Sequence, residues 1–185
     1  IGACDWSSDV CSSDLAEALL RAAGAAPGDL TRIGVNTGPG GFAGTRVGVA
    51  FARGLALSTG ARALGVGALD ALALRADPAG EKTVMAVHDA RRGTMIWKIV
   101  AHGLPVTALK RGGADDALSE LEAYGDIHLT GSGAVLLGAD PDHFDPAPPL
   151  DALLALTESA PDDAPPPAPL YARPPDATPP GGADR

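Results

Sequence analysis

A glycine-rich turn is the segment of this sequence best suited to binding phosphate. It spans residues 37–44, reads TGPGGFAG and precedes an expected helix, whose N-terminal N–H groups would attract an anion. A P-loop requires Lys-Ser or Lys-Thr directly after its last glycine, and neither pair follows this turn. Gly38, Gly40 and Ala43 match a loose dinucleotide pattern, but the next acid, Asp70, comes 27 residues after Ala43 rather than about 20. A tight turn that only glycine can make is the alternative interpretation.

The other reactive side chains lack a catalytic spacing. Ser132 lies between two glycines but outside the G-x-S-x-G pattern of serine hydrolases, which favours a turn. The histidines are His88, His102, His128 and His143. None is paired at i and i+4 as in a helical zinc site, so we expect no metal ligand. Asp89 and Arg91 are either a catalytic pair or an ordinary ion pair at the end of a hairpin.

Helical and extended patterns alternate around these segments. We expect helices over 16–25, 46–59, 69–75, 114–123 and 150–157, and strands over 30–36, 63–66, 82–88, 94–101 and 127–130. Gly60 is placed to end the second helix. The pattern predicts an α/β fold.

Composition narrows the function classes. The chain has 185 residues and a net charge of −9, without the basic stripe that grips nucleic acid by its phosphates. It has no run of about 20 apolar residues and no secretory signal, which predicts a cytoplasmic protein without a membrane contact. Of its 17 prolines, 13 lie at or beyond Pro141, which predicts an extended tail.

The first fifteen residues differ from the rest. Residues 5–15 read DWSSDVCSSDL, have no helical or strand period, and resemble the translation of a sequencing adapter. We therefore expect residues 1–15 to be non-native, and we assign no function to Cys4 or Cys11. A genuine Ser/Asp-rich loop is the alternative.

The helix after the glycine-rich turn carries a ridge of small side chains. Gly44, Gly48, Ala52 and Ala56 recur every four residues and share one face. A second helix can approach such a ridge closely, because many weak dispersion contacts then add up. The helix is apolar on nearly all sides, so part of it should be covered by another protein or by the rest of this domain. Under the first interpretation, Gly48→Leu or Ala52→Leu would abolish pairing without unfolding the chain.

Four segments resemble motifs of the TsaB (YeaZ-like) family, in the family's order. The turn is similar to the signature GPGSFTGLRIG, with matches at Gly38, Pro39, Gly40, Phe42, Gly44 and Arg46. The other matches are Asp89 and Arg91 of a DAR-x-G hairpin, Gly131 and Gly133 of a TG-x-G-A turn, and Tyr171 and Arg173 of a closing P-x-Y-x-R segment. The signature Ser and Thr are replaced here by Gly41 and Ala43, which weakens a chemical role for the turn.

The resemblance implies an actin-like/Hsp70-like (ASKHA, Gcp-like) fold and a non-catalytic subunit. The family pairs with TsaD, which transfers a threonylcarbamoyl group to the adenosine adjacent to the anticodon of tRNA, and the ATPase TsaE joins them. The complex uses ATP and Mg²⁺, whereas this chain alone should bind no cofactor and contact tRNA only indirectly. Self-association without TsaD stays open. A stand-alone nucleotide-dependent enzyme of the actin-like/sugar-kinase superfamily is the alternative function.

The family's partner contact uses two helices, which correspond here to 16–25 and 45–59. The residues expected at this interface are Leu19, Leu20, Ala23, Gly44, Val47, Gly48, Phe51, Ala52, Leu55 and Ala56. We expect a first subdomain over 16–75 with its opening strands absent and a sheet edge unpaired. A second subdomain is expected over 76–160, followed by a Pro-rich tail over 161–185.

Overall fold

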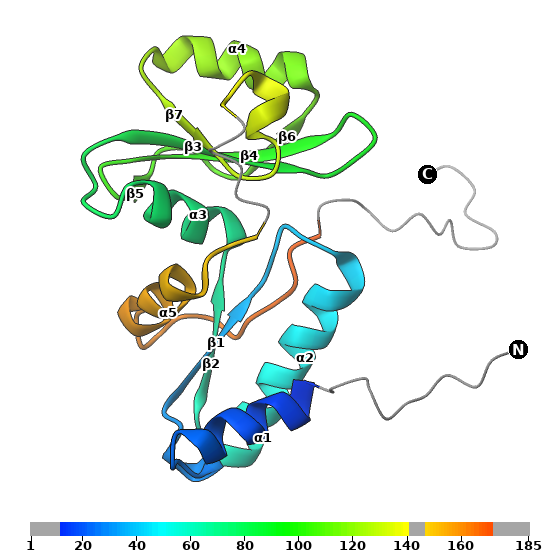
Figure 1. Cartoon of the computed structure of the whole chain (residues 1–185), viewed down its shortest axis with the longest axis vertical. Coiled ribbons are helices and arrows are strands. Elements are labelled where there is room, and N and C mark those ends of the chain that lie inside the picture. The colour runs from blue at the N-terminus through cyan, green and yellow to red at the C-terminus, as the bar shows by residue number, and fades with distance from the viewer. Residues whose placement is uncertain (1–11, 141–146, 172–185) are drawn as a thin grey trace, which may run out of the picture.

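The computed structural model describes residues 12–140 and 147–171 (Figure 1). The helices are α1 (Ser12–Ala22), α2 (Phe42–Thr59), α3 (Ala68–Ala76), α4 (Ala114–Tyr124) and α5 (Leu150–Ser159), with short 3-10 helices η1 (Pro27–Asp29) and η2 (Ala134–Leu137). The strands are β1 (Arg32–Asn36), β2 (Arg62–Val66), β3 (Thr83–Asp89), β4 (Met95–Ala101), β5 (Leu104–Pro105), β6 (Lys110–Gly112) and β7 (His128–Thr130).

The first sheet consists of β1 and β2, which are parallel and joined by α2. Side chains alternate across a strand, so successive β1 residues face opposite layers. The Cβ position of Gly34 points at Thr157 of α5, whereas Val35 reaches Gly48 of α2. The two helices therefore cover opposite faces of this sheet (Figure 1). Within 12–140 and 147–171, β1 pairs with no strand except β2; the absence of opening strands from the first subdomain stays a prediction.

The second sheet has the order β5-β4-β3-β7, and β6 also pairs with β4. The strands β3 and β4 form the expected antiparallel hairpin, and β7 lies parallel to β3 on its other side. On β3, Met85 and Val87 face the layer of α4, whereas Val84 and Ala86 face α3. This sheet is therefore buried on both faces, which explains the nearly continuous apolar run of β3.

Two charged contacts tie the helices to the second sheet. Lys98 lies on the α3 side of β4 and pairs with Asp70 of α3. On the α4 side, Glu120 accepts hydrogen bonds from Trp97 Nε1 at 2.9 Å and from Lys110 Nζ at 2.7 Å. Burial raises the pKa of the Glu120 carboxyl, but these two donors outweigh it and hold the pKa below its ordinary value.

The last helix returns to the first sheet. Arg32 of β1 donates to the carbonyl oxygens of Thr157 at 3.2 Å and Ala160 at 2.7 Å, at the C-terminal end of α5. A cation stabilises a helix at this end, where carbonyl groups lack intrahelical partners. Asp162 then accepts from both Arg32 and Arg62. Although α5 falls within the expected second subdomain, it lies against β1 and β2; the division at residues 75 and 160 stays a prediction.

Two helix boundaries differ from the prediction. We expected the first helix over 16–25, but α1 begins at Ser12 and ends at Ala22. Asp14 in its first turn suits the positive end of the helix, and Gly24 ends it with a φ of 67°. The last residues of the adapter-like segment are thus helical. The second helix starts at Phe42 rather than at residue 46, and Gly60 ends it as expected.

The segment after α5 runs along the first sheet and has no helix or strand as far as residue 171. The high proline content of this segment predicted such an extended conformation. Pro167 lies beside Gly65 of β2, and the Leu170 N–H donates to the Thr37 carbonyl oxygen at 2.8 Å. No helix in the described part of the chain is long and apolar enough to cross a membrane. Cys4, Cys11, His143 and Arg173 lie outside the described residues.

Candidate functional site

The glycine-rich turn is partly buried and contacts β1, the start of α3 and the segment after α5. Gly38 and Pro39 are buried and joined by a cis peptide bond, and Gly38 has a φ of 100°. Its N–H donates to Asn36 Oδ1 at 2.9 Å, and its carbonyl oxygen accepts from the Ala68 N–H at 2.8 Å. The turn therefore connects β1 to the start of α3. Gly40, in contrast, is exposed.

The first turn of α2 contacts Tyr171 through an aromatic cluster. The Arg46 guanidinium lies 3.7 Å from the centre of the Phe42 ring and 5.0 Å from that of Tyr171. Its Nε also donates to the Tyr171 hydroxyl at 3.2 Å, and the two ring centres are 5.5 Å apart. At exposed sites such a cation–π contact contributes about 0.5–1 kcal/mol. Phe42 and Arg46 of the signature thus bind a residue of the closing motif.

The small-residue ridge of α2 lies mostly against the first sheet of this chain. Ala52 and Ala56 are buried, and the Cβ position of Gly48 lies 3.7 Å from Val35 Cγ2. The ridge lets α2 approach β1 and β2 closely, so burial argues against partner contacts at Ala52 and Ala56, which stay a prediction. Helical periodicity shows which residues share a face, but it does not show what covers that face. Gly44, at the start of the ridge, is exposed with open space beside it.

A different face of α2 is directed outward. Val47 is 58% exposed and Leu57 is 89% exposed, although both side chains are large and apolar. Between them, the small residues Ala50 and Gly54 are also exposed. These positions form a stripe at i, i+3, i+7 and i+10, which is the spacing of one helix face. We call Val47, Ala50, Gly54 and Leu57 the outward face of α2; its last three residues were missed by the sequence interpretation.

The helix α1 lies beside α2 and adds apolar side chains to the same region (Figure 1). Leu19 is 61% exposed and Ala23 is exposed, whereas Leu20 is half-buried. Of the other expected interface residues, Phe51 and Leu55 are half-buried. The structure thus leaves Leu19, Ala23, Gly44 and Val47 most accessible and turns the remainder partly or wholly inward.

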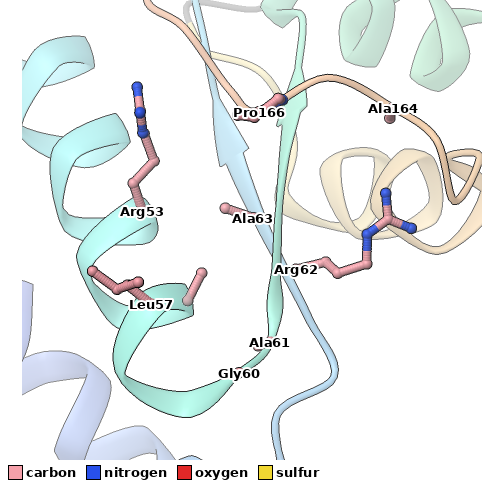
Figure 2. A pocket seen from close by; sticks show the side chains of 9 residues that line it. Arg53, Leu57, Gly60, Ala61, Arg62, Ala63, Ala164 and Pro166 are labelled. Atoms are coloured by element: carbon pink, nitrogen blue, oxygen red, sulfur yellow. The ribbon is translucent and has the colours of Figure 1, made fainter.

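A shallow hollow adjoins the C-terminal end of α2 (Figure 2). It has a volume of about 440 Å³ and opens between α2, the start of β2 and the segment after α5. Its walls are mostly short side chains, among them Ala56, Ala61, Ala63 and Ala164. Two arginines, Arg53 and Arg62, stand at its rim, and Arg62 is paired with Asp162.

The hairpin motif forms a tight turn at its tip. The Asp89 Oδ1 accepts a hydrogen bond from the Arg91 N–H at 2.8 Å, and the two side chains approach to 4.0 Å. Arg91 and Arg92 have φ values of 67° and 53°, so the backbone turns sharply there. The arrangement matches the hairpin-end interpretation of Asp89 and Arg91.

The TG-x-G turn packs directly against β3. A Cβ at Gly131 would lie 2.3 Å from the Val87 carbonyl oxygen, and one at Gly133 would lie 2.7 Å from Val87 Cγ1. Between them, Ser132 Oγ accepts the Asp89 N–H at 3.0 Å and lies 3.2 Å from His88 Nδ1. The direction of this second hydrogen bond follows the tautomer of His88, because a serine hydroxyl can donate one hydrogen bond and accept two. Ser132 thus connects two strand ends, and sequence spacing gave no sign of its contact with His88.

Burial of His88 lowers the pKa of its imidazole, and Arg91 acts in the same direction against the opposing effect of Asp89. The neutral form of the imidazole is therefore favoured. Across the part of the chain that the structure describes, no three His, Cys, Asp or Glu side chains are grouped to hold a metal ion.

Comparison with known proteins identifies the family. The family model described as "TsaD: tRNA N6-adenosine threonylcarbamoyltransferase" matches residues 12–106, just over half of the chain. This chain belongs to the TsaD family. Its similarity within that family is to the TsaB/YeaZ proteins, so the resemblance based on sequence motifs is confirmed.

The TsaB protein of Escherichia coli K12, "tRNA threonylcarbamoyladenosine biosynthesis protein TsaB", is 35% identical over 80 residues. That match takes in 43% of this chain and 35% of the E. coli protein, so the chain spans about a third of this relative. YeaZ from Pseudomonas aeruginosa superimposes with a TM-score of 0.64 at 27% identity, covering 77% of this chain and 72% of YeaZ.

A second solved structure, a protein described as similar to peptidase YeaZ from Pseudomonas aeruginosa, also gives a TM-score of 0.64. It is 26% identical and covers 85% of this chain and 81% of its own. Together with the TsaD-family match, these structures confirm the predicted actin-like, Gcp-like α/β fold.

Proposed function

We propose that this chain is a non-catalytic subunit of the machinery that forms threonylcarbamoyladenosine in tRNA, and that it acts by binding TsaD. Membership of the TsaD family and the similarity to the TsaB protein of E. coli support the pathway. The observation that carries the binding role is the apolar surface formed by the outward face of α2 and by Leu19 of α1. An exposed apolar surface on two adjacent helices is typical of a protein interface.

The shape of this surface suits a partner helix. Ala50 and Gly54 lie between Val47 and Leu57, so an incoming helix can approach the backbone of α2 between two large side chains. Helices packed in this way lie about 8–10 Å apart. Burying the exposed parts of Val47, Leu57 and Leu19 would contribute on the order of 1–2 kcal/mol each.

The charge of the chain supports an indirect role with RNA. A net charge of −9 opposes binding to the phosphates of tRNA, so we assign the RNA contact to other subunits of the complex. We likewise assign ATP and Mg²⁺ to the complex, in which TsaE is the ATPase, and place this chain in the cytoplasm.

Pairing with TsaD can be measured by co-purification and by isothermal titration. We expect Val47→Asp to weaken binding by at least about tenfold, because a carboxylate would be buried without a partner. Leu154→Asp is the matched control, since Leu154 is also 58% exposed on a helix but lies on α5, across the sheet from α2. Equal binding by both variants and the wild-type chain would contradict the proposed surface.

Activity is measured as threonylcarbamoyladenosine in tRNA after incubation with TsaD, TsaE and threonylcarbamoyl-adenylate. Product should depend on this chain and should fall with Val47→Asp. ATP turnover with Mg²⁺ by this chain alone would instead support the stand-alone nucleotide-dependent enzyme.

A further inference from the structure

We infer that Arg53 is the point on α2 at which TsaD contributes an acidic side chain. The inference rests on the proposed pairing with TsaD and adds the chemistry of one contact. The helix α2 has no acidic residue, although the chain contains 23 Asp and Glu. Its two cations, Arg46 and Arg53, are both exposed.

The two arginines differ in what surrounds them. Arg46 is occupied by the rings of Phe42 and Tyr171 and by the Tyr171 hydroxyl. The side chain of Arg53 makes no hydrogen bond, ion pair or ring contact within residues 12–140 and 147–171. An arginine side chain has five N–H donors and no acceptor, so Arg53 can offer all of them to another molecule.

The position of Arg53 places it inside the proposed interface. It lies between Ala50 and Leu57 along the outward face of α2, at the rim of the 440 Å³ hollow (Figure 2). A partner that covers Leu57 would also remove Arg53 from water. A buried cation without a counter-charge costs several kcal/mol, whereas a carboxylate matches the fork of the guanidinium.

The hollow itself suits a short acidic side chain. Its lining includes the short residues Ala56, Gly60, Ala61 and Ala63, which leave room for an inserted group. The other cation that lines it, Arg62, is paired with Asp162, a carboxylate that it shares with Arg32. Arg53 is therefore the cation of this hollow whose side chain has no carboxylate partner within residues 12–140 and 147–171.

The test is the affinity of TsaD for charge variants of the full chain. We expect Arg53→Glu to weaken binding at least about 30-fold, Arg53→Met to weaken it about tenfold, and Arg53→Lys to weaken it least. Raising the salt from about 0.05 M to about 0.5 M should weaken wild-type binding more than it weakens binding of Arg53→Met. Arg111→Glu is the control, because Arg111 is an exposed arginine on β6 of the other sheet.

The outcomes separate the two proposals. If Val47→Asp abolishes pairing while Arg53→Glu binds like the wild-type chain, the acidic contact is wrong and the pairing surface stands. If Arg53→Glu and Arg111→Glu weaken binding equally, net charge rather than this contact is responsible, and the inference fails. If the wild-type chain does not bind TsaD, both proposals are wrong.

Discussion

At the scale of single residues, the turn after β7 is tightly restricted in sequence. Gly131 has a φ of 96°, and a Cβ there would overlap the Val87 carbonyl oxygen. We expect Gly131→Ala to lower the free energy of unfolding by at least about 2–3 kcal/mol. Chemical denaturation followed by circular dichroism measures this change.

The control for that variant is Gly138→Ala. Gly138 has a φ of 90°, but nothing lies within 4 Å of its Cβ position, so this change adds conformational strain without a clash. We expect a loss of about 1 kcal/mol. Equal losses at the two glycines would show that the contact with Val87 contributes nothing.

His88 gives a pH dependence whose sign follows from its burial. Because the pKa of His88 is lowered in the folded chain, the unfolded chain binds a proton more readily. This contribution to stability is complete above the ordinary histidine pKa of about 6.5 and is lost as the pH falls through and below it. We expect His88→Asn, whose side-chain amide can replace Nδ1 in the hydrogen bond with Ser132, to lose less stability between about pH 7.5 and pH 5. Parallel curves for both proteins would contradict this assignment.

At the scale of elements, α2 shows what the sequence predicts and what it leaves open. Its C-terminal end at Gly60 was predictable, because glycine at that position favours the end of a helix. That the helix must be largely covered was also predictable, because it is mostly apolar. Which face turns inward was not, because small and apolar residues occur on every side. The positions of Arg46 and Arg53 could have identified the outward face, because charged side chains on an apolar helix point to solvent. The outward face of α2 lies next to these two arginines around the helix.

The inward face of α2 gives a prediction opposite to the one from periodicity alone. Ala52 is buried against the first sheet, so Ala52→Leu should overpack that contact and cost about 1–3 kcal/mol in the free energy of unfolding. Ala50→Leu is the matched control, because Ala50 is exposed two residues away and should leave stability nearly unchanged. Thermal unfolding of the two variants distinguishes them. If the Ala52→Leu protein were as stable as the wild-type chain, the ridge would not be packed tightly against the first sheet and could contact a partner.

The elements of the second sheet were predicted more completely than those of the first. The hairpin of β3 and β4 and the helix α4 follow from clear periodicity and a glycine-containing connection. The short strands β5 and β6 were missed, because two or three residues show no alternation. The contact between His88 and Ser132 was missed for a different reason: it joins residues 44 positions apart, and local pattern carries no such information.

At the scale of the whole molecule, α5 connects the two sheets by contacting β1, β2 and α3. Gly34 allows this approach, since a Cβ there would lie 2.0 Å from Thr157 Oγ1. We expect Gly34→Ala to displace α5 and to increase hydrogen exchange in both α5 and β1. Adding Thr157→Ala removes the closest atoms and should restore part of the protection. Unchanged exchange in Gly34→Ala would show that α5 is not held by this contact.

The return of α5 to β1 also sets an order of events during synthesis. Arg32 and the Thr157 carbonyl oxygen that it binds are 125 residues apart, so one face of the first sheet stays bare until nearly the whole described chain has left the ribosome. The second sheet, whose strands and helices follow one another closely, can form beforehand. A stalled or prematurely ended chain would thus expose β1 to other proteins while its second half is already folded.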